Sequence, residues 1–328
     1  MRRLSLLLVL IAVIAAACGR KSGAPVRVVI PKGAAFREAT DSLANHGLVG
    51  SPRLFRAYAR LIRRDRRIRA GTYILQRGAS WNEIITALST GRGLVHTVRV
   101  VEGFRIETIG NVLATQLTVP VESVYVAVTD SALRHRLDVP TTTIEGYLFP
   151  DTYLFGDRTS ARAAVERMVE RFESVWQPEW DERLRALAMS RHDIMTLASI
   201  IEKEARLPDE RPVIAAVYHN RLRIGMPLQA DPTVQYATGK YGQRVLLKDL
   251  EHASRYNTYR YPGLPPGPIC SPGAASIHAA LFPADVPYLY FVAHPDGHHE
   301  FRTTFEGHTK ARRDIRQRSG RRTRASPR

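Results

Sequence analysis

The sequence predicts an α+β fold in which a small β-α repeat module precedes a mainly helical domain with long loops. Three stretches of the first part of the chain alternate at strand period and then change to helical spacing. Later helical stretches are interrupted by loops rich in Gly and Pro. With 328 residues, 44% of them hydrophobic, the chain has room for two domains with real cores. We predict an N-terminal segment at 1–18, a linker at 19–25, the repeat module at 26–120, the helical domain at 121–312 and a disordered tail at 313–328.

The repeat module consists of three predicted units, each a strand, a turn at a glycine and an amphipathic helix. The units span Val26–Val49, Gly71–Gly91 and Thr97–Leu117, and they turn at Gly33, Gly78 and Gly103. Because each unit changes from strand to helix period, we expect short β-α units that pack on one another. None of their residues is a candidate for catalysis.

The N-terminus carries a predicted export signal. Two arginines precede the apolar run Leu4–Cys18, which is shorter than the roughly 17 to 25 residues of a membrane-spanning helix. Small residues lead into Cys18, as at a bacterial lipoprotein cleavage site, so we predict lipidation there, with a single uncleaved span as the alternative. Both alternatives, lipidation and a single span, predict a membrane anchor with the domains on the extracytoplasmic side. Cys270 then has no disulfide partner, and we expect it to be a small, partly buried residue in a Pro-rich loop.

The charge of the chain is strongly basic, with a formal net charge of +17. Such a balance raises nucleic-acid binding as a hypothesis. However, nine basic residues and one acid fall between Lys310 and Arg328, so the tail alone carries +8. A polar, Arg-rich end without apolar periodicity is typical of a disordered, solvated tail. We therefore predict no nucleic-acid partner, and contact of the tail with anionic lipid or wall polymers stays a less favoured alternative.

One helical stretch, Ala198–Ala205, sets two acids beside an apolar stripe. The helix is predicted to begin after the capping residue Ser190 and to end before Pro208. Glu202 and Glu204 fall on opposite flanks of the stripe, so they cannot serve one site. The stripe itself consists of Ile194, Leu197, Ala198, Ile201 and Ala205. A carboxyl group at such an edge is a way to keep an acid protonated near neutral pH. The alternative is a surface helix in which Glu202 pairs with Arg206, one turn further on.

Amide and aromatic side chains follow in the loops after this helix. Amides donate to and accept from sugar hydroxyl and N-acetyl groups, and tyrosine rings offer flat faces to sugars. Each is also explained singly by loop capping or packing, but together they predict a groove. The candidates are Asn220, Gln229, Asp231, Tyr256, Asn257 and Tyr259.

No metal or cofactor is predicted. His294, His298 and His299 lie close in sequence, but they lack the spacing of two ligands on one helix face. The sequence contains no Gly-rich phosphate loop, no nucleophile elbow and no Cys/His pairing.

Four long segments carry a resemblance to a known family: Glu145–Phe155, Val217–Gly239, Tyr256–Leu281 and Tyr288–Ala293. Together with the IIEKE string they closely resemble the endolytic murein transglycosylase family (MltG-like, formerly YceG-like). The resemblance runs from about Val26 to His308, keeps the segments in the order of the family, and uses strings too long to recur by chance. It implies that the first Glu of IIEKE, Glu202, is the catalytic acid.

The resemblance also implies an activity and a setting. Such enzymes cleave peptidoglycan glycan strands inside the strand, between N-acetylmuramic acid and N-acetylglucosamine, and leave 1,6-anhydro ends. One acid suffices, because the 6-hydroxyl of the sugar replaces water as the nucleophile, and we expect no second carboxylate at the site. Part of the repeat module would be LysM-like and bind glycan, or would only brace the catalytic domain. The family works at the cell membrane beside peptidoglycan synthases as a terminator of strand elongation, and usually keeps a single membrane span. The alternative function is a non-catalytic peptidoglycan-binding scaffold.

Overall fold

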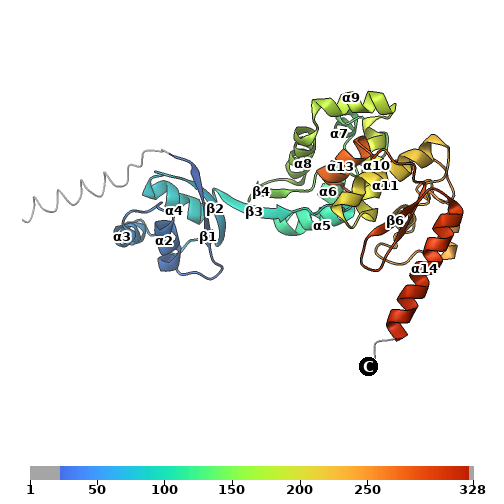
Figure 1. The fold of residues 1–328 in the computed structure, drawn as a ribbon. Coiled ribbons are helices and arrows are strands. Elements are labelled where there is room, and N and C mark those ends of the chain that lie inside the picture. Colours follow the sequence, from blue (N-terminus) through green and yellow to red (C-terminus); the bar gives the residue numbers. More distant parts are fainter. Residues whose placement is uncertain (1–22, 325–328) are drawn as a thin grey trace, which may run out of the picture. The chain divides into compact units, whose positions relative to one another are not determined.

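The computed structural model describes residues 23–324, with side chains up to residue 318, and is shown in Figure 1. It is an α+β protein, as predicted, and its contacts divide it into two compact units. Within the described residues, unit 1 contains 23–98, 115–118 and 152–160, and unit 2 contains the remainder. The predicted boundary at residue 120 therefore differs from the division by contacts, which places most of the third repeat helix in unit 2.

Unit 1 is built around a four-stranded sheet in the order β1-β2-β3-β4. β1 pairs antiparallel with β2 along its whole length, and β2 pairs antiparallel with β3 only at its first residues. The strands are β1 (Pro25–Ile30), β2 (Gly71–Gln76), β3 (Leu94–Arg99) and β4 (Thr152–Gly156), and the helices are α2 (Phe36–Asn45), α3 (Pro52–Leu61) and α4 (Trp81–Thr90). Each of the three predicted β-α units is present, as β1-α2, β2-α4 and β3-α5 (Ile106–Leu117).

Local sequence explains these elements well. Ser80 begins α4 with a capping box, because its hydroxyl accepts from the backbone of Glu83 while the Glu83 carboxylate accepts from Ser80. Gly91 ends the helix in the left-handed conformation, at φ 78°, which favours glycine. The apolar faces of α2, α3 and α4 close over the sheet and bury Phe55, Tyr73 and Leu88 completely.

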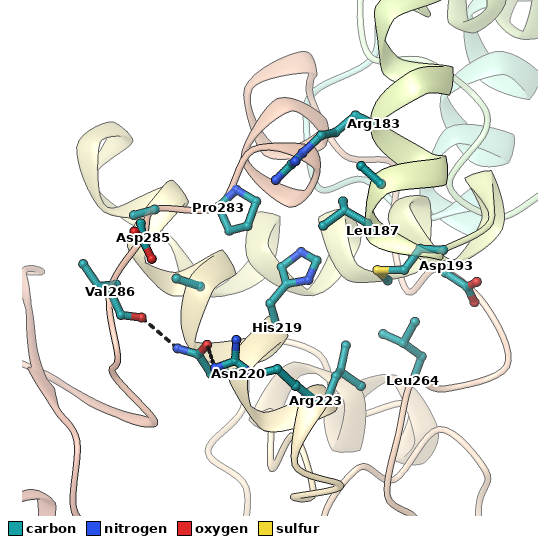
Figure 2. Close-up of a pocket in the computed structure, with 15 residues that line it drawn as sticks. Arg183, Leu187, Asp193, His219, Asn220, Arg223, Leu264, Pro283, Asp285 and Val286 are labelled. Atoms are coloured by element: carbon teal, nitrogen blue, oxygen red, sulfur yellow. Dashed lines mark hydrogen bonds between the residues drawn. The ribbon is translucent and has the colours of Figure 1, made fainter.

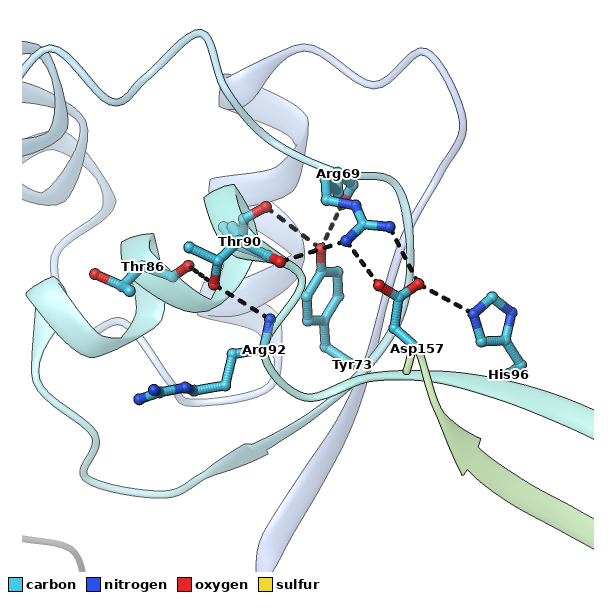
Figure 3. Close-up of polar contacts among 8 residues, drawn as sticks. Arg69, Tyr73, Thr86, Thr90, Arg92, His96 and Asp157 are labelled. Carbon is cyan, nitrogen blue, oxygen red and sulfur yellow. Dashed lines mark hydrogen bonds and ion pairs between the residues drawn. The ribbon is translucent and has the colours of Figure 1, made fainter. Parts of the chain in front are cut away.

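A polar cluster fixes the end of β4 within unit 1 (Figure 3). The Arg69 guanidinium donates to both carboxylate oxygens of Asp157, at 2.7 and 3.1 Å, and the His96 ring lies 3.2 Å from the same carboxylate. The Tyr73 hydroxyl donates to the backbone oxygen of Arg69 at 2.7 Å, and burial raises the pKa of Tyr73 to about 12. The cluster ties the loop before β2 to the residue that follows β4.

Unit 2 is mainly helical and contains long loops, as predicted. Its helices from the amino-terminal side are most of α5, then α6 (Val121–Val128), α7 (Ser131–Arg136), α8 (Ala161–Val175) and α9 (Pro178–Leu187). They are followed by α10 (Arg191–Glu204), the short turn η1 (Pro208–Glu210), α11 (Arg211–Arg223), α12 (Asp231–Thr238), η2 (Leu247–Glu251) and α13 (Ala274–Leu281). Cys270 is buried in the Pro-rich loop and unpaired, and its thiol donates to the backbone oxygen of Ser199 at 3.4 Å.

An antiparallel hairpin and a terminal helix complete unit 2. β5 (Tyr290–Ala293) pairs with β6 (His299–Arg302), and α14 follows (Phe305–Arg324). The prediction of a disordered tail from residue 313 was wrong as far as residue 324. The cause is a short apolar stripe within the basic stretch: Ala311 and Ile315, one helical turn apart, are buried, and the His308 ring lies 5.3 Å from that of Tyr290.

Among the described residues no helix is long and apolar enough to cross a bilayer. The predicted anchor and Cys18 lie outside the described residues.

Candidate functional site

The two acids of the IIEKE string lie at the carboxyl end of α10. Ser190 caps the start of this helix, as predicted, through a capping box with Asp193. Ile194 to Ile201 are buried on every side, so the middle of the helix runs through the core, whereas its first and last turns are partly accessible. Glu202 and Glu204 leave this last turn in different directions and meet different groups, which confirms that they do not share a site.

Glu204 lines a cavity of about 480 Å³ in unit 2. The Tyr218 hydroxyl, on the neighbouring α11, donates to Glu204 Oε1 at 3.3 Å. Burial raises the pKa of Glu204 to about 7, and the negative charge of Asp231 raises it further, whereas the Tyr218 hydrogen bond and the Arg221 guanidinium lower it. A large fraction of Glu204 is therefore protonated at neutral pH, as a general acid requires.

Three predicted binding residues line the same cavity. Gln229 holds a left-handed backbone, at φ 49°, and its N–H donates to the Thr258 oxygen. Asp231 is the first residue of α12, and its carboxylate accepts from the Tyr259 hydroxyl at 2.6 Å. Hydrogen bonds through Thr258 tie these two loops together, since Ala230 N–H donates to its hydroxyl at 3.0 Å. The structure brings the predicted residues Gln229, Asp231 and Tyr259 together in this cavity.

The other three predicted binding residues have structural contacts elsewhere. The Asn257 amide donates to the backbone oxygens of Leu250 and His252, and its oxygen accepts from Tyr259 N–H, so Asn257 positions Tyr259. The Tyr256 ring packs on Tyr236, with centroids 4.7 Å apart.

Asn220 is also occupied by the backbone. Its amide donates to the oxygen of Val286 at 2.8 Å, as Figure 2 shows, and to the oxygen of Tyr288 at 3.0 Å. Asn220 lines a different cavity, on the other side of α11 from Arg221. The predicted groove therefore contains half of its predicted members.

Glu202 is held at the amino-terminal end of α13. Its Oε2 accepts from Gly273 N–H at 3.0 Å and from the Ser276 hydroxyl at 2.7 Å. Arg211 Nε donates to the same hydroxyl at 3.2 Å. Glu102 lies beside this carboxylate, and burial, followed by the negative charge of Glu202, raises the pKa of Glu102. These contacts make Glu202 a cap for α13, and none of them is with a residue of the Glu204 cavity.

Several residues of the cavity were not predicted. The Arg221 guanidinium donates to the oxygens of Leu289 and Leu228, at 2.7 and 2.6 Å, and lies over the Tyr290 ring. His308 and Arg312 enter from α14, in the segment predicted to lie at the end of the domain. Tyr218 and Arg221 are three residues apart, so a helical wheel of α11 puts them on one face, but only packing shows that this face meets Glu204.

A second carboxylate in the cavity corrects one expectation. The sequence predicts a single acid at the site, yet Asp231 and Glu204 line the same cavity. Asp231 is engaged by Tyr259 and raises the pKa of Glu204 through its charge. The cavity thus contains an acid with a raised pKa and a hydrogen-bonded carboxylate, a set of groups suited to proton transfer at a glycosidic bond.

Each histidine of the 294–299 segment contacts one carboxylate. His294 contacts Glu300 at 3.0 Å, and His299 contacts Glu210 at 2.6 Å. The part of the chain that the structure describes contains no group of three His, Cys, Asp or Glu side chains arranged to hold a metal ion.

A carboxyl group whose pKa is raised to about 7, in a cavity lined by amide and tyrosine side chains, is suited to acid catalysis on a carbohydrate. Comparison with known proteins identifies the family: the YceG-like family matches residues 28–314, and the chain belongs to it. It is 34% identical over 309 residues to the endolytic murein transglycosylase of Bacillus subtilis, covering 89% of this chain and 85% of that protein.

Two further relatives agree with this membership. The endolytic murein transglycosylase of Streptococcus pneumoniae (strain D39) is 28% identical over 82% of this chain, which spans about half the length of that protein. A 2.6 Å crystal structure of a putative YceG-like protein from Listeria monocytogenes superposes with a TM-score of 0.61 at 30% identity. The superposition covers 88% of this chain and all of that one.

Proposed function

We propose that this protein is a lytic transglycosylase that cleaves peptidoglycan glycan strands internally, at the β-1,4 bond between N-acetylmuramic acid and N-acetylglucosamine. The observation that carries the proposal is the cavity in which Glu204, with its pKa raised to about 7, lies with Gln229, Asp231 and Tyr259. Membership of the YceG-like family and the names of the curated relatives support the same activity.

In the proposed mechanism Glu204 acts twice. Its protonated carboxyl group donates a proton to the glycosidic oxygen as the bond to carbon 1 of the muramic sugar breaks. The resulting carboxylate then takes the proton of the 6-hydroxyl group as that oxygen bonds to carbon 1. The acid is regenerated, no water is consumed, and the new end is a 1,6-anhydro sugar.

The choice between the two acids rests on their surroundings. The sequence resemblance favours Glu202 as the catalytic acid, and that assignment stays a prediction. However, the Glu202 carboxylate already accepts hydrogen bonds from Gly273 N–H and the Ser276 hydroxyl. Glu204 lines a cavity, has one weak donor and has a raised pKa. These differences support Glu204 as the acid, with Glu202 as a residue that positions α13.

The experiment that tests the reaction is mass analysis of sacculi digested with the full-length chain. We expect internal fragments that end in 1,6-anhydro-N-acetylmuramic acid. Reducing ends in their place would mean that water is the nucleophile, with Asp231 as its activating base, and the protein would be a hydrolase.

The setting of the enzyme is also proposed. The predicted export signal supports attachment to the cell membrane through the N-terminus, by a lipid at Cys18 or by a single span, with both units on the extracytoplasmic side. Labelling with a fatty acid tests this: Cys18→Ser should abolish the label, whereas an unlabelled wild-type protein that keeps Met1 would favour a span.

The β-α units of unit 1 support a LysM-like role in holding glycan strands. Deleting the whole module would also remove part of α5, so the test uses full-length chains with substitutions at exposed positions of unit 1. Weaker pull-down on insoluble peptidoglycan would favour binding, and unchanged pull-down would favour bracing. By the same family resemblance, the enzyme would act on nascent strands beside a peptidoglycan synthase and end their elongation. Crosslinking in cells that captures no synthase would contradict this last role.

A further inference from the structure

A second and larger cavity, of about 920 Å³, lies in unit 2 between α9, α11 and the segment that precedes β5 (Figure 2). In this view Arg183 and Arg223 lie on opposite sides of the cavity, with His219 between them. None of the groups assigned to the reaction lines it, since Glu204, Gln229, Asp231 and Tyr259 belong to the other cavity. A function for this second cavity must therefore be sought in its own residues.

Both arginines are held in position without an acid partner. Arg183 donates through Nε to the Leu281 oxygen at 2.7 Å and lies over the Phe282 ring, which leaves its terminal nitrogens for other acceptors. Arg223 donates to Asn220 Oδ1 at 2.9 Å, and Asn220 is itself fixed by two backbone oxygens. Within residues 23–318 neither guanidinium lies within 4 Å of a carboxylate oxygen. Fixed guanidinium groups of this kind are suited to bind carboxylates.

The remaining polar groups narrow the chemistry of the ligand. His219 donates to the Ala280 oxygen at 2.8 Å, and burial lowers its pKa, so the ring is neutral at pH 7. Asp193 and Asp285 also line the cavity, and Asp285 is exposed. Alternating positive and negative groups disfavour a polyanion such as a phosphate polymer. They favour an extended ligand that carries separate carboxylates and an amino group, which is the chemistry of a peptide.

The two cavities are close enough for one branched ligand to reach both. Val286 lines the second cavity and Tyr290 lines the Glu204 cavity, so four residues of chain, at most about 14 Å, separate them. Asn220 and Arg221, adjacent on α11, both donate to backbone oxygens of this segment. In peptidoglycan a short peptide branches from each N-acetylmuramic acid, and an extended peptide of four residues spans roughly 14 Å.

We propose that this cavity binds the stem peptide of the strand whose glycan is cleaved at Glu204, with Arg183 and Arg223 as the carboxylate-binding groups. The inference rests on the proposed function for its substrate. It adds a specificity site: strands that carry peptides bind better than bare glycan.

The first experiment measures binding alone. A synthetic stem tetrapeptide is titrated into the full-length wild-type chain in detergent by calorimetry, beside the same peptide with its carboxylates converted to amides. We expect binding of the acid form only, weakened about tenfold or more by Arg183→Ala or Arg223→Ala. Arg185→Ala, an exposed change on the same helix as Arg183, is the matched control and should bind as the wild type does.

The second experiment measures cleavage of intact strands and of strands stripped of peptides by an amidase. The wild type should have the lower KM for intact strands, and Arg223→Ala should lose this preference while cutting bare strands normally. Equal binding of the amidated peptide, no binding at millimolar concentration, or no preference between strands would overturn the peptide site. Peptide binding without anhydro products would instead refute the proposed reaction and leave the peptide site standing.

Discussion

Glu202 and Glu204 are two residues apart on one helix, yet their surroundings differ in almost every respect. Glu202 accepts two hydrogen bonds at the start of α13, from a backbone N–H and a hydroxyl. Glu204 has a single phenol donor at 3.3 Å, a carboxylate neighbour and a cavity in front of it. Donors favour a charged carboxylate, whereas burial and like charge favour the neutral acid.

Under the proposed mechanism, one helical turn carries both an acid that caps α13 and an acid that transfers a proton. The carboxyl end of α10 lies between two segments, the loop that begins α13 on one side and the α11–α12 region on the other. A rotation of roughly 200° between the two side chains directs them to these separate segments.

The largest effect should come from exchanging the two acids for glutamine. Glu204→Gln keeps the shape but cannot give up a proton, so strand cleavage should fall by roughly a hundredfold to ten-thousandfold. Glu202→Gln keeps an acceptor for Gly273 N–H and should lose less than about tenfold. Release of anhydro fragments from sacculi measures both.

The opposite result would reverse the assignment of the acid. If Glu202→Gln were inactive, with an unchanged melting temperature, and Glu204→Gln remained active, Glu202 would be the general acid, as the family resemblance implies.

The next effect concerns the buried acid Glu145. Burial raises the pKa of Glu145 from 4.5 to about 7, although the Ile106 N–H at 2.9 Å and the Arg105 charge oppose this. The folded state then keeps a proton that the unfolded state loses. The resulting stability is full below pH 4.5 and is lost as the pH rises through about 7, by about 3 kcal/mol at most.

Glu145→Gln should therefore flatten the pH dependence of folding. The free energy of unfolding from urea titrations at pH 5 and pH 8 measures this, with the exposed Glu122→Gln as control. Glu204, whose pKa is also raised, lowers the free energy of unfolding in the same way as the pH rises. Part of the pH dependence of stability should therefore remain in the Glu145→Gln variant. An unchanged slope would mean that Glu145 is ionised in the fold. Cleavage should be retained, because Glu145 is not among the groups assigned to the reaction.

A smaller effect should follow removal of the cap on α13. Glu202→Ala leaves the Gly273 N–H and the buried Ser276 hydroxyl without their acceptor, which should cost about 1–3 kcal/mol of unfolding free energy. The exposed neighbour Lys203→Ala should change stability little. Chemical unfolding of both variants tests the structural role. If the Glu202→Ala protein were as stable as the wild type, Glu202 would have no role in stabilising α13.

Much of the fold could be predicted because its signals are local. Strand period, glycine turns and caps lie within about twenty residues, so the three β-α units and the start of α10 at Ser190 were predicted correctly. The helical tail was missed, because Ala311 and Ile315 are only two apolar residues in a strongly basic stretch. Their burial depends on β5, which no local pattern reveals.

The site could be predicted only in part, for the same reason. Gln229, Asp231 and Tyr259 follow from residue chemistry, and their meeting depends on Thr258, which joins the two loops. The helical wheel predicted that the acids of α10 diverge, but a wheel cannot tell which neighbour each will meet. Those neighbours, Tyr218 for one acid and Ser276 for the other, come from helices that pack on α10 only in the folded chain.

The smallest expected effect is also the sharpest test of the Glu204 surroundings. The Tyr218 hydrogen bond lowers the pKa of Glu204 and the charge of Asp231 raises it, so removing each should move the alkaline limb of the pH–rate profile in opposite directions. In the wild type kcat/KM should decline as the pH rises through about 7, because the acid loses its proton. Tyr218→Phe should move this limb upward and Asp231→Asn downward, each by less than about one pH unit. Both variants can lower the rate at its optimum, but only the midpoint of the limb reports the acid. A limb that moves in the same direction in both variants, or in neither, would show that Glu204 is not the group that titrates.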